Sequence, residues 1–433
     1  MCDFSGHVFD IDVDFSGYVF PGDANFGLRP QSDTPVFFNK TANFSQVTFL
    51  SSAQFWNAHF LQKADFSKTR FNGPVRFANA VFQRRVNFIS AHFLNTVRFG
   101  GAECNDWARF EGAIFHEEVR FESSQFVWAE FSNVTFRGDV FFLGAKFKTL
   151  AYFPRARFLG TNVDFSGVIS HGVFYLRDVH FEKVPDFVQA NFDQAPNLDN
   201  VSLPLPWILW KGQKRNIANY RTLRRLANQG HDYEREQWFA KGELRSRRLT
   251  DDTPLAPAFW LGVAYDLFSD CGHSLLRPLL AWLCCIVIFA IYFLGQNAEM
   301  TELRDASAAN GFIRRVAAYA TTAWNAASGE LSVSCVSRTQ NGITGLAKPV
   351  RDRTNPVNEA LSIAYHNAVI VLDSSGDSFH RAFGCLYGVE RYGGNPVAHV
   401  PRSVAIASGI QKLLSAIFIF LFGLAVRNML KVK

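Results

Sequence analysis

Phenylalanine recurs at a fixed spacing through the first half of the chain. Two series each advance in steps of eleven residues and are offset by five, so steps of five and six alternate. On an α-helix such steps would turn successive side chains by about 140° and 240°, which produces no apolar stripe. The phenylalanines predicted to point inward are Phe44, Phe49, Phe55, Phe60, Phe66, Phe71, Phe77, Phe82, Phe88, Phe93, Phe99, Phe110, Phe115, Phe121 and Phe126.

The residue two positions before each phenylalanine is usually small or β-branched, as at Ala42, Ala64 and Val75. In an extended chain, positions i and i−2 point to the same side, so the residue between them, such as Asp65, points outward. One short segment cannot bury its inward face alone, whereas stacked coils can. Residues 1–205 are therefore predicted to form an all-β solenoid.

The spacing also sets the size of a coil. Coils of roughly 20–22 residues would give about nine or ten coils. A bulge or wider turn is expected to absorb the extra residue of each six-residue step, and loops are expected around 26–43 and 166–180, where the pattern falters.

The repeated cadence of a small residue, Asp or Asn, and Phe resembles the pentapeptide-repeat family. It stands at Ala42–Phe44, Ala64–Phe66 and Val163–Phe165. The resemblance implies a right-handed quadrilateral β-helix with Phe at the central inward position. Many members keep an unbroken five-residue step, which this chain does not.

Residues 206–260 are rich in helix-forming residues and are predicted to be a helical linker. Tyr220, Leu223 and Leu226 stand at helical spacing, Gly230 is a helix stop, and Asp232 can cap a second helix. We expect a helical hairpin that covers the open end of the solenoid.

Two apolar stretches in residues 261–433 are predicted to span a membrane, at about 276–295 and 404–426. Arg277 and Pro278 mark the boundary of the first helix, and Arg427 that of the second. The second helix must include Gln411 and Lys412, which should face a helix partner or a water-filled cavity.

The intervening segment, 296–402, has two interpretations. One is an ordinary extracytoplasmic domain, in which Cys335 and Cys385 could form a disulfide. The other is a re-entrant pore over 358–378, with Asp373 and Asp377 in its polar loop, although no TVGYG-like filter is present.

The ends of this region resemble those of membrane-bound bacterial pentapeptide-repeat proteins with a two-helix transmembrane domain. The resemblance lies in residues 265–278 and 420–428. It implies a multi-pass protein of the bacterial plasma membrane. Positive charge beside both apolar stretches predicts that the N- and C-termini are cytosolic, and no signal peptide is visible at the start of the sequence.

The formal charge of +6 is unevenly distributed. Residues 1–205 hold 18 Lys and Arg against 21 Asp and Glu, so the basic excess lies in the linker and beyond it. No nucleic-acid partner is expected for the repeats. The linker arginines are predicted to face anionic lipid headgroups. The alternative of an RNA or phosphate site has no aromatic or Gly-rich pattern in its support. The linker arginines are Arg221, Arg224, Arg225, Arg235, Arg245, Arg247 and Arg248.

The sequence contains no GxGxxG, P-loop, HExxH or GxSxG motif, and its seven Cys form no metal-ligand spacing. No enzyme activity, cofactor or metal is therefore predicted. The leading hypothesis is a membrane-anchored scaffold whose cytosolic β-helix binds an unknown protein partner through outward residues such as Arg76, Arg98 and Arg120. The alternative is an oligomeric two-helix ion channel with 358–378 as the pore segment and the β-helix as regulatory domain. The expected partners of such a channel are the lipid bilayer and further copies of the chain.

Overall fold

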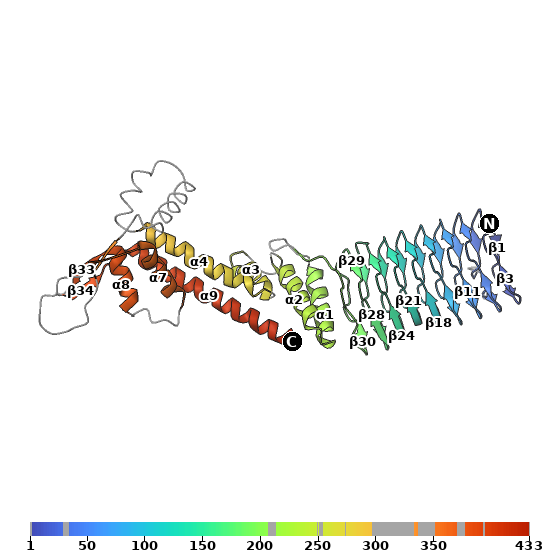
Figure 1. The fold of residues 1–433 in the computed structure, drawn as a ribbon. Helices are drawn as coiled ribbons and strands as arrows, with labels where there is room; N and C mark the ends of the chain where they lie inside the picture. Colours follow the sequence, from blue (N-terminus) through green and yellow to red (C-terminus); the bar gives the residue numbers. More distant parts are fainter. Residues whose placement is uncertain are drawn as a thin grey trace. The chain divides into compact units, whose positions relative to one another are not determined.

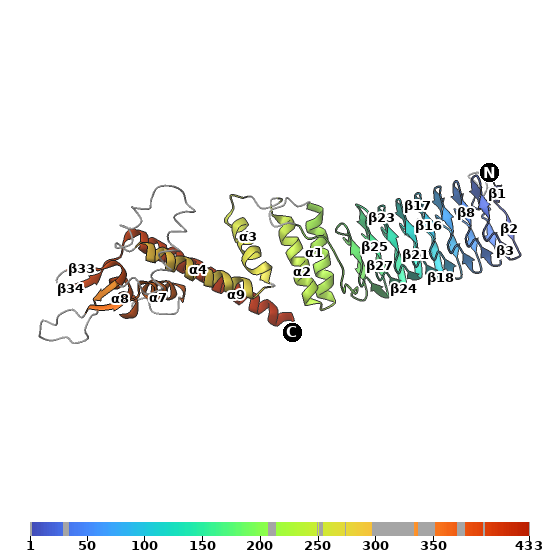
Figure 2. The ribbon, with the colours of Figure 1, turned by 45° about the horizontal axis from the view of Figure 1, so that its top comes forward.

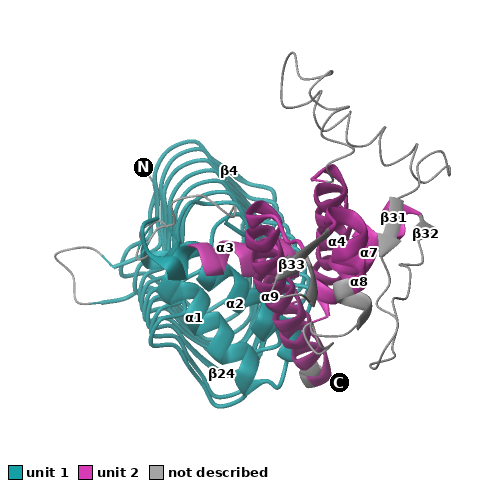
Figure 3. Cartoon of the chain, turned by 90° about the vertical axis from the view of Figure 1, so that its left-hand side faces the viewer, with its two compact units in different colours: residues 1–259 teal, residues 260–433 magenta. Residues whose placement is uncertain are grey.

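The computed structural model describes residues 2–28, 34–206, 214–248, 250, 254–272, 274–296, 333–336, 351–369, 377–392 and 395–432. The chain divides into two compact units, Met1–Phe259 and Trp260–Lys433 (Figure 3). The helical linker therefore belongs to the first unit.

Short parallel strands stack in successive coils through the first unit (Figures 1 and 2). The first ladder contains β1 (Cys2–Asp3), β5 (Ala24–Asn25), β9 (Ala53–Gln54), β13 (Val75–Arg76), β17 (Val97–Arg98), β20 (Val119–Arg120), β23 (Val140–Phe141) and β26 (Val163–Asp164). The ladder on another side contains β4 (Val19–Phe20), β8 (Thr48–Phe49), β12 (Arg70–Phe71), β16 (His92–Phe93), β19 (Ile114–Phe115), β22 (Thr135–Phe136), β25 (Arg157–Phe158) and β29 (His180–Phe181).

Two further ladders begin separately and then merge. One contains β2 (Val8–Phe9), β6 (Phe37–Phe38), β10 (His59–Phe60) and β14 (Val81–Phe82), and the other contains β3 (Val13–Asp14), β7 (Ala42–Asn43), β11 (Ala64–Asp65) and β15 (Val86–Asn87). Both β14 and β15 pair with the long strand β18 (Glu103–Arg109). The merged sheet continues through β21 (Gln125–Glu130), β24 (Lys146–Tyr152), β27 (Ile169–Ser170), β28 (Val173–Tyr175) and β30 (Asn191–Phe192).

The predicted parallel β-solenoid is confirmed, with about eight coils and not nine or ten. Strand partners lie 22 residues apart where Ala42 pairs with Ala64, but 29 apart where Val8 pairs with Phe37, because an insertion lengthens an early coil. The prediction of a loop around 166–180 is wrong. Strands β27 and β28 occupy that range and pair with β24.

Most five-residue steps contain a tight turn with a left-handed residue. After Phe66, the Asp65 carboxylate accepts a hydrogen bond from the Ser67 amide at 3.0 Å, and Lys68 has φ of +56°. The Thr69 amide then donates to the Phe66 carbonyl at 3.3 Å, as in a type II turn. The Asp or Asn of the repeat therefore fixes the turn while its neighbours fill the core.

Stacked phenylalanine rings form that core. Every inward phenylalanine predicted from the sequence is at most 1% exposed. Phe44 and Phe66 stack at 4.9 Å and Phe66 and Phe88 at 5.1 Å, one coil apart. Each buried ring contributes about 1.5–3 kcal/mol by removal from water. Cys104 takes the place of a phenylalanine between Phe82 and Phe126.

The hairpin of α1 (Lys214–Gln229) and α2 (Tyr233–Arg247) covers the end of the β-helix, as predicted (Figure 1). Tyr220, Leu223 and Leu226 continue the phenylalanine core. The Asp232 side chain caps α2 by accepting from the Arg235 amide, and the Arg235 side chain donates to the Val201 carbonyl at 3.0 Å. These contacts satisfy polar groups that the last coil would leave open.

The second unit is built around two long helices. Its elements are α3 (Pro257–Ser269), which begins in the first unit, η1 (Asp270–Gly272), α4 (Leu276–Gly295), β31 (Val333–Val336), β32 (Arg351–Thr354), α7 (Pro356–Ala368), α8 (Asp377–Tyr387), β33 (Val389–Tyr392), β34 (Asn395–Ala398) and α9 (Arg402–Val432). The short helix α7 packs against both α4 and α9 (Figure 1). Ile363 and Ala364 of α7 are fully buried in the core that these three helices share.

Candidate functional site

The merged sheet of the β-helix carries a row of apolar side chains on its outer surface. Trp107 of β18 lies beside Trp128 of β21, followed in register by Leu150 of β24 and Val173 of β28. The two tryptophan rings stack with centroids 6.0 Å apart and planes 10° from parallel. We call these four residues the aromatic column.

A second row runs beside the aromatic column. Arg109 pairs with Glu130 at 3.0 Å, and the next two coils carry Tyr152 and Tyr175, whose rings stack at 5.1 Å. Val173 is 42% exposed and both tryptophans are partly exposed. Adjacent apolar and aromatic side chains on a protein surface are typical of a protein-binding patch.

The spacing of the phenylalanines does not predict the aromatic column, because the column depends on the lengths of the strands. The column forms where β18, β21 and β24 extend to six or seven residues, while most other strands of the β-helix have two. A usable signal was present, since Trp107, Trp128 and Leu150 each directly precede an inward alanine.

The outward arginines predicted as contact residues form a ladder in register. Arg76 of β13 pairs with Arg98 of β17, which pairs with Arg120 of β20. Arg120 also contacts Glu118 and Glu122, and its guanidinium lies 4.8 Å from the centre of the Phe141 ring. Arg76 and Arg98 are exposed and form no ion pair within the described part of the chain.

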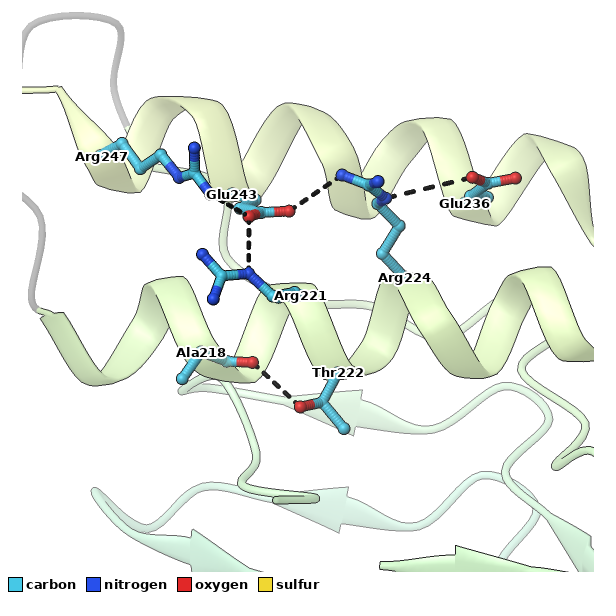
Figure 4. A network of polar contacts seen from close by, with 7 residues as sticks. All are labelled: Ala218, Arg221, Thr222, Arg224, Glu236, Glu243 and Arg247. Carbon is cyan, nitrogen blue, oxygen red and sulfur yellow. Dashed lines mark hydrogen bonds and ion pairs between the residues drawn. The ribbon is translucent and has the colours of Figure 1, made fainter. Parts of the chain in front are cut away.

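Three arginines of the hairpin converge on one carboxylate (Figure 4). The Glu243 side chain, 5% exposed, accepts from Arg221 at 3.0 Å, Arg224 at 3.1 Å and Arg247 at 2.8 Å. Arg224 also lies 4.0 Å from Glu236. Glu243 therefore ties α1 to α2 and gathers guanidinium groups at one place. We call Arg221, Arg224, Arg247 and Glu243 the arginine cluster.

Among the described residues, α4 and α9 are long and apolar enough to cross a membrane. Core helices of soluble proteins also pass that test, but only 39% of the apolar window of α4 and 22% of that of α9 are buried within the chain. Leu279, Leu283 and Val287 of α4 are exposed, as are Leu413 and Phe420 of α9. Lipid would cover these side chains more favourably than water does.

Buried polar groups lie where α7 meets α9. Gln411 is fully buried and donates to the Ala364 carbonyl at 2.8 Å, and it accepts from Asn367 at 3.3 Å. This confirms the prediction that Gln411 faces a helix partner. The side-chain oxygens of Asn367, Ser408 and Ser415 are buried and have no hydrogen-bond partner among the described residues.

The other residues singled out in the sequence are spread over the second unit. Arg277 and Pro278 lie in the first turn of α4, with Arg277 3.5 Å from Asp270, and Arg427 lies in the last part of α9. Asp373 lies outside the described residues, as does the side chain of Asp377, the first residue of α8.

The cysteines fall into two groups. Cys385 of α8 is disulfide-bonded, whereas the thiols of Cys2, Cys104, Cys284 and Cys285 are free. Burial raises the pKa of the Cys104 thiol far above its usual range, which makes it a poor nucleophile. No group of three or more His, Cys, Asp or Glu residues suited to a metal occurs in the described parts of either unit.

The β-helix matches a known repeat family. Residues 66–114, 77–125 and 131–180 match the family described as pentapeptide repeats (9 copies). These matches lie within the stacked coils and agree with the turn and core geometry described above. No curated protein and no solved structure matches the chain.

Proposed function

We propose that this chain is a non-enzymatic, membrane-anchored pentapeptide-repeat scaffold that binds a protein partner through the aromatic column. The observation that carries the proposal is the stacked pair Trp107 and Trp128, continued by Leu150 and Val173 on the outside of a rigid rod. Large aromatic side chains that are already fixed in place lose little conformational entropy on binding and dominate many interfaces.

Membrane anchoring rests on the exposed apolar surfaces of α4 and α9. Basic residues stand near the ends of both helices that would then face the cytosol, Arg277 in α4 and Arg427 in α9. The aromatic column would therefore be presented on the cytosolic side of a bacterial plasma membrane.

Site-specific photo-crosslinking in cells tests the partner-binding surface. A photoreactive phenylalanine analogue at Leu150 should give a discrete protein adduct, and Trp107→Ala with Trp128→Ala should abolish it. The analogue at Leu50, which is 49% exposed and directly follows β8 of another ladder, serves as the control. Equal adducts from Leu50 and Leu150, or an adduct that survives the double substitution, would contradict the proposal.

The second candidate function is ion conduction by an oligomer, and one observation favours it. The end of α7 hydrogen-bonds to both apolar helices, through Trp282 to the Ala368 carbonyl at 3.4 Å and through Gln411 to the Ala364 carbonyl at 2.8 Å. Trp282 and Gln411 lie well inside α4 and α9 and not at their ends. A short helix that ends between two spanning helices has the order of parts of a two-helix channel.

Ion flux in proteoliposomes that hold the full chain separates the two candidates. A channel predicts flux that Gln411→Leu reduces, whereas Ile410→Leu, at an exposed neighbour, leaves it unchanged. Replacement of Asp373 and Asp377 by Ala tests the polar stretch of sequence between α7 and α8. Absence of flux across pH and voltage would leave the second unit as an anchor.

A further inference from the structure

We propose that the arginine cluster binds the phosphate group of an anionic phospholipid. This inference goes beyond the proposed function, because it concerns a different surface from the aromatic column and stands whether or not that column binds a protein. It assigns to the hairpin a second role besides closing the β-helix.

The charges of the arginine cluster do not balance. Arg221, Arg224 and Arg247 carry three positive charges, and they share the single carboxylate of Glu243. The only additional acidic contact in the described residues is Glu236, at 4.0 Å from Arg224. Even with both carboxylates counted, a positive charge remains, and a bound anion would neutralise it.

Donors remain available for such an anion. A guanidinium has five N–H groups, and each of the three arginines uses one nitrogen on Glu243. Their side chains are 59%, 47% and 40% exposed for Arg221, Arg224 and Arg247. The fork of a guanidinium fits two phosphate oxygens at once, which a lysine ammonium cannot do.

The arrangement is fixed before any ligand binds. Tyr220, Leu223 and Leu226 hold α1 on the core of the β-helix, so the arginines of the same helix cannot move apart freely. Glu243 is buried between α1 and α2 and holds one guanidinium nitrogen of each arginine within 3.1 Å (Figure 4). A site that is already organised loses less entropy on binding than a set of mobile surface lysines.

The sequence indicates a lipid as the source of the phosphate. Residues 214–248 contain ten Lys and Arg against four Asp and Glu, and the apolar helix α4 begins 28 residues after Arg248. Basic segments close in sequence to a spanning helix are attracted to the anionic cytoplasmic leaflet.

A titration of the full chain in neutral detergent tests the site. Isothermal titration with short-chain phosphatidylglycerol should show saturable binding, and short-chain phosphatidylcholine should bind at least about tenfold more weakly. Arg221→Gln with Arg224→Gln should reduce phosphatidylglycerol affinity by about tenfold or more. Arg76→Gln with Arg98→Gln removes the same charge from exposed positions of the β-helix and should leave affinity unchanged.

Further variants and ligands separate the effect of net charge from two other factors, the geometry of the guanidinium groups and the molecule that supplies the phosphate. Arg221→Lys with Arg224→Lys keeps the charge but removes the forks, and should weaken binding by about threefold or more. Hydrogen exchange of α1 checks that the hairpin stays folded. Three outcomes would each overturn the proposal. The Lys variant could keep wild-type affinity, or the two Gln pairs could lose affinity equally. Inorganic phosphate or RNA could also bind as tightly as phosphatidylglycerol.

Discussion

At the scale of single residues, the β-helix depends on left-handed backbone positions two residues after an inward phenylalanine. Asn57, Asn79 and Asn133 hold such positions with φ between +53° and +55°, and Gly112 holds the equivalent position with φ of +65°. Asn tolerates this conformation because its short polar side chain can bond locally, whereas a β-branched residue does not.

This gives a graded prediction at Gly112. Gly112→Val should lower the free energy of unfolding of the β-helix by about 1–2 kcal/mol, from backbone strain. Gly112→Asn should be nearly neutral, because the nearest atom to a new Cβ, the Ser90 hydroxyl, lies 3.6 Å away. Denaturant unfolding followed by far-UV circular dichroism measures both. Equal stability of the Val and Asn variants would refute the role of the left-handed turn.

A thiol prediction follows from the burial of Cys104. Burial raises the pKa of this thiol, so the reactive thiolate stays scarce as the pH rises through 8 to 10, where an ordinary cysteine ionises. Maleimide labelling mapped by peptide mass spectrometry should therefore modify Cys2, which is partly exposed, and spare Cys104 until denaturant unfolds the coils. Native labelling of Cys104 at the rate of Cys2 would show that the core opens.

The inward phenylalanines could be predicted from sequence because one local rule, the alternation of steps of five and six residues, repeats through most of the coils. The aromatic column was harder to predict: three of its residues precede an inward alanine, but their placement on one sheet depends on where two ladders merge. At that point β18 pairs with both β14 and β15, so Trp107 and the residues in register with it lie on the merged sheet. That merging is a property of neighbouring coils and not of a single repeat.

At the scale of elements, the hairpin depends on a close approach of its two helices. Gly242 of α2 faces Tyr220 of α1, and a Cβ at this glycine would lie 2.4–2.7 Å from three atoms of the tyrosine ring. Tyr220 is itself fully buried, and its hydroxyl donates to the Pro204 carbonyl. The ring therefore has little room to move.

Gly242→Ala should destabilise the hairpin although alanine is the better helix former. Overpacking costs about 1–3 kcal/mol, against a gain of about 1 kcal/mol in helix propensity. Faster hydrogen exchange in α1 and α2 would show the loss of hairpin stability. Gly230→Ala is the matched control, since its nearest new contact is an ordinary 3.4 Å to Ala195. A more stable Gly242→Ala variant would show that the helices can separate without cost.

Helix ends were predictable where a side chain makes the cap, as with Asp232, because that signal is local. The strands within 166–180 could not be predicted, and a loop was expected there instead. Strands β27 and β28 form because they pair with β24, although the local sequence pattern is irregular. The contact of α7 with Gln411 likewise needed the fold, because Ala364 and Gln411 lie 47 residues apart.

At the scale of the whole molecule, the two units differ in what covers their apolar side chains. The β-helix buries its phenylalanines within its own coils, and the hairpin covers their end. Helices α4 and α9 leave Leu283, Val287 and Phe420 exposed. Lipid or further copies of the chain would cover these exposed side chains of the second unit.

The membrane topology gives the last prediction. For the proposed membrane-anchored chain, the charges of Arg277 and Arg427 predict that the start of α4 and the end of α9 lie on the same, cytosolic side. The disulfide-bonded Cys385 lies between the two helices, where an oxidising compartment would keep it oxidised. Green fluorescent protein fused after Lys433 should therefore fluoresce, and alkaline phosphatase should be active when fused after Gln296 but inactive after Lys433. Active phosphatase at the C-terminus would place that end outside the cytosol, and the arginine cluster would then lose the anionic leaflet that it is proposed to bind.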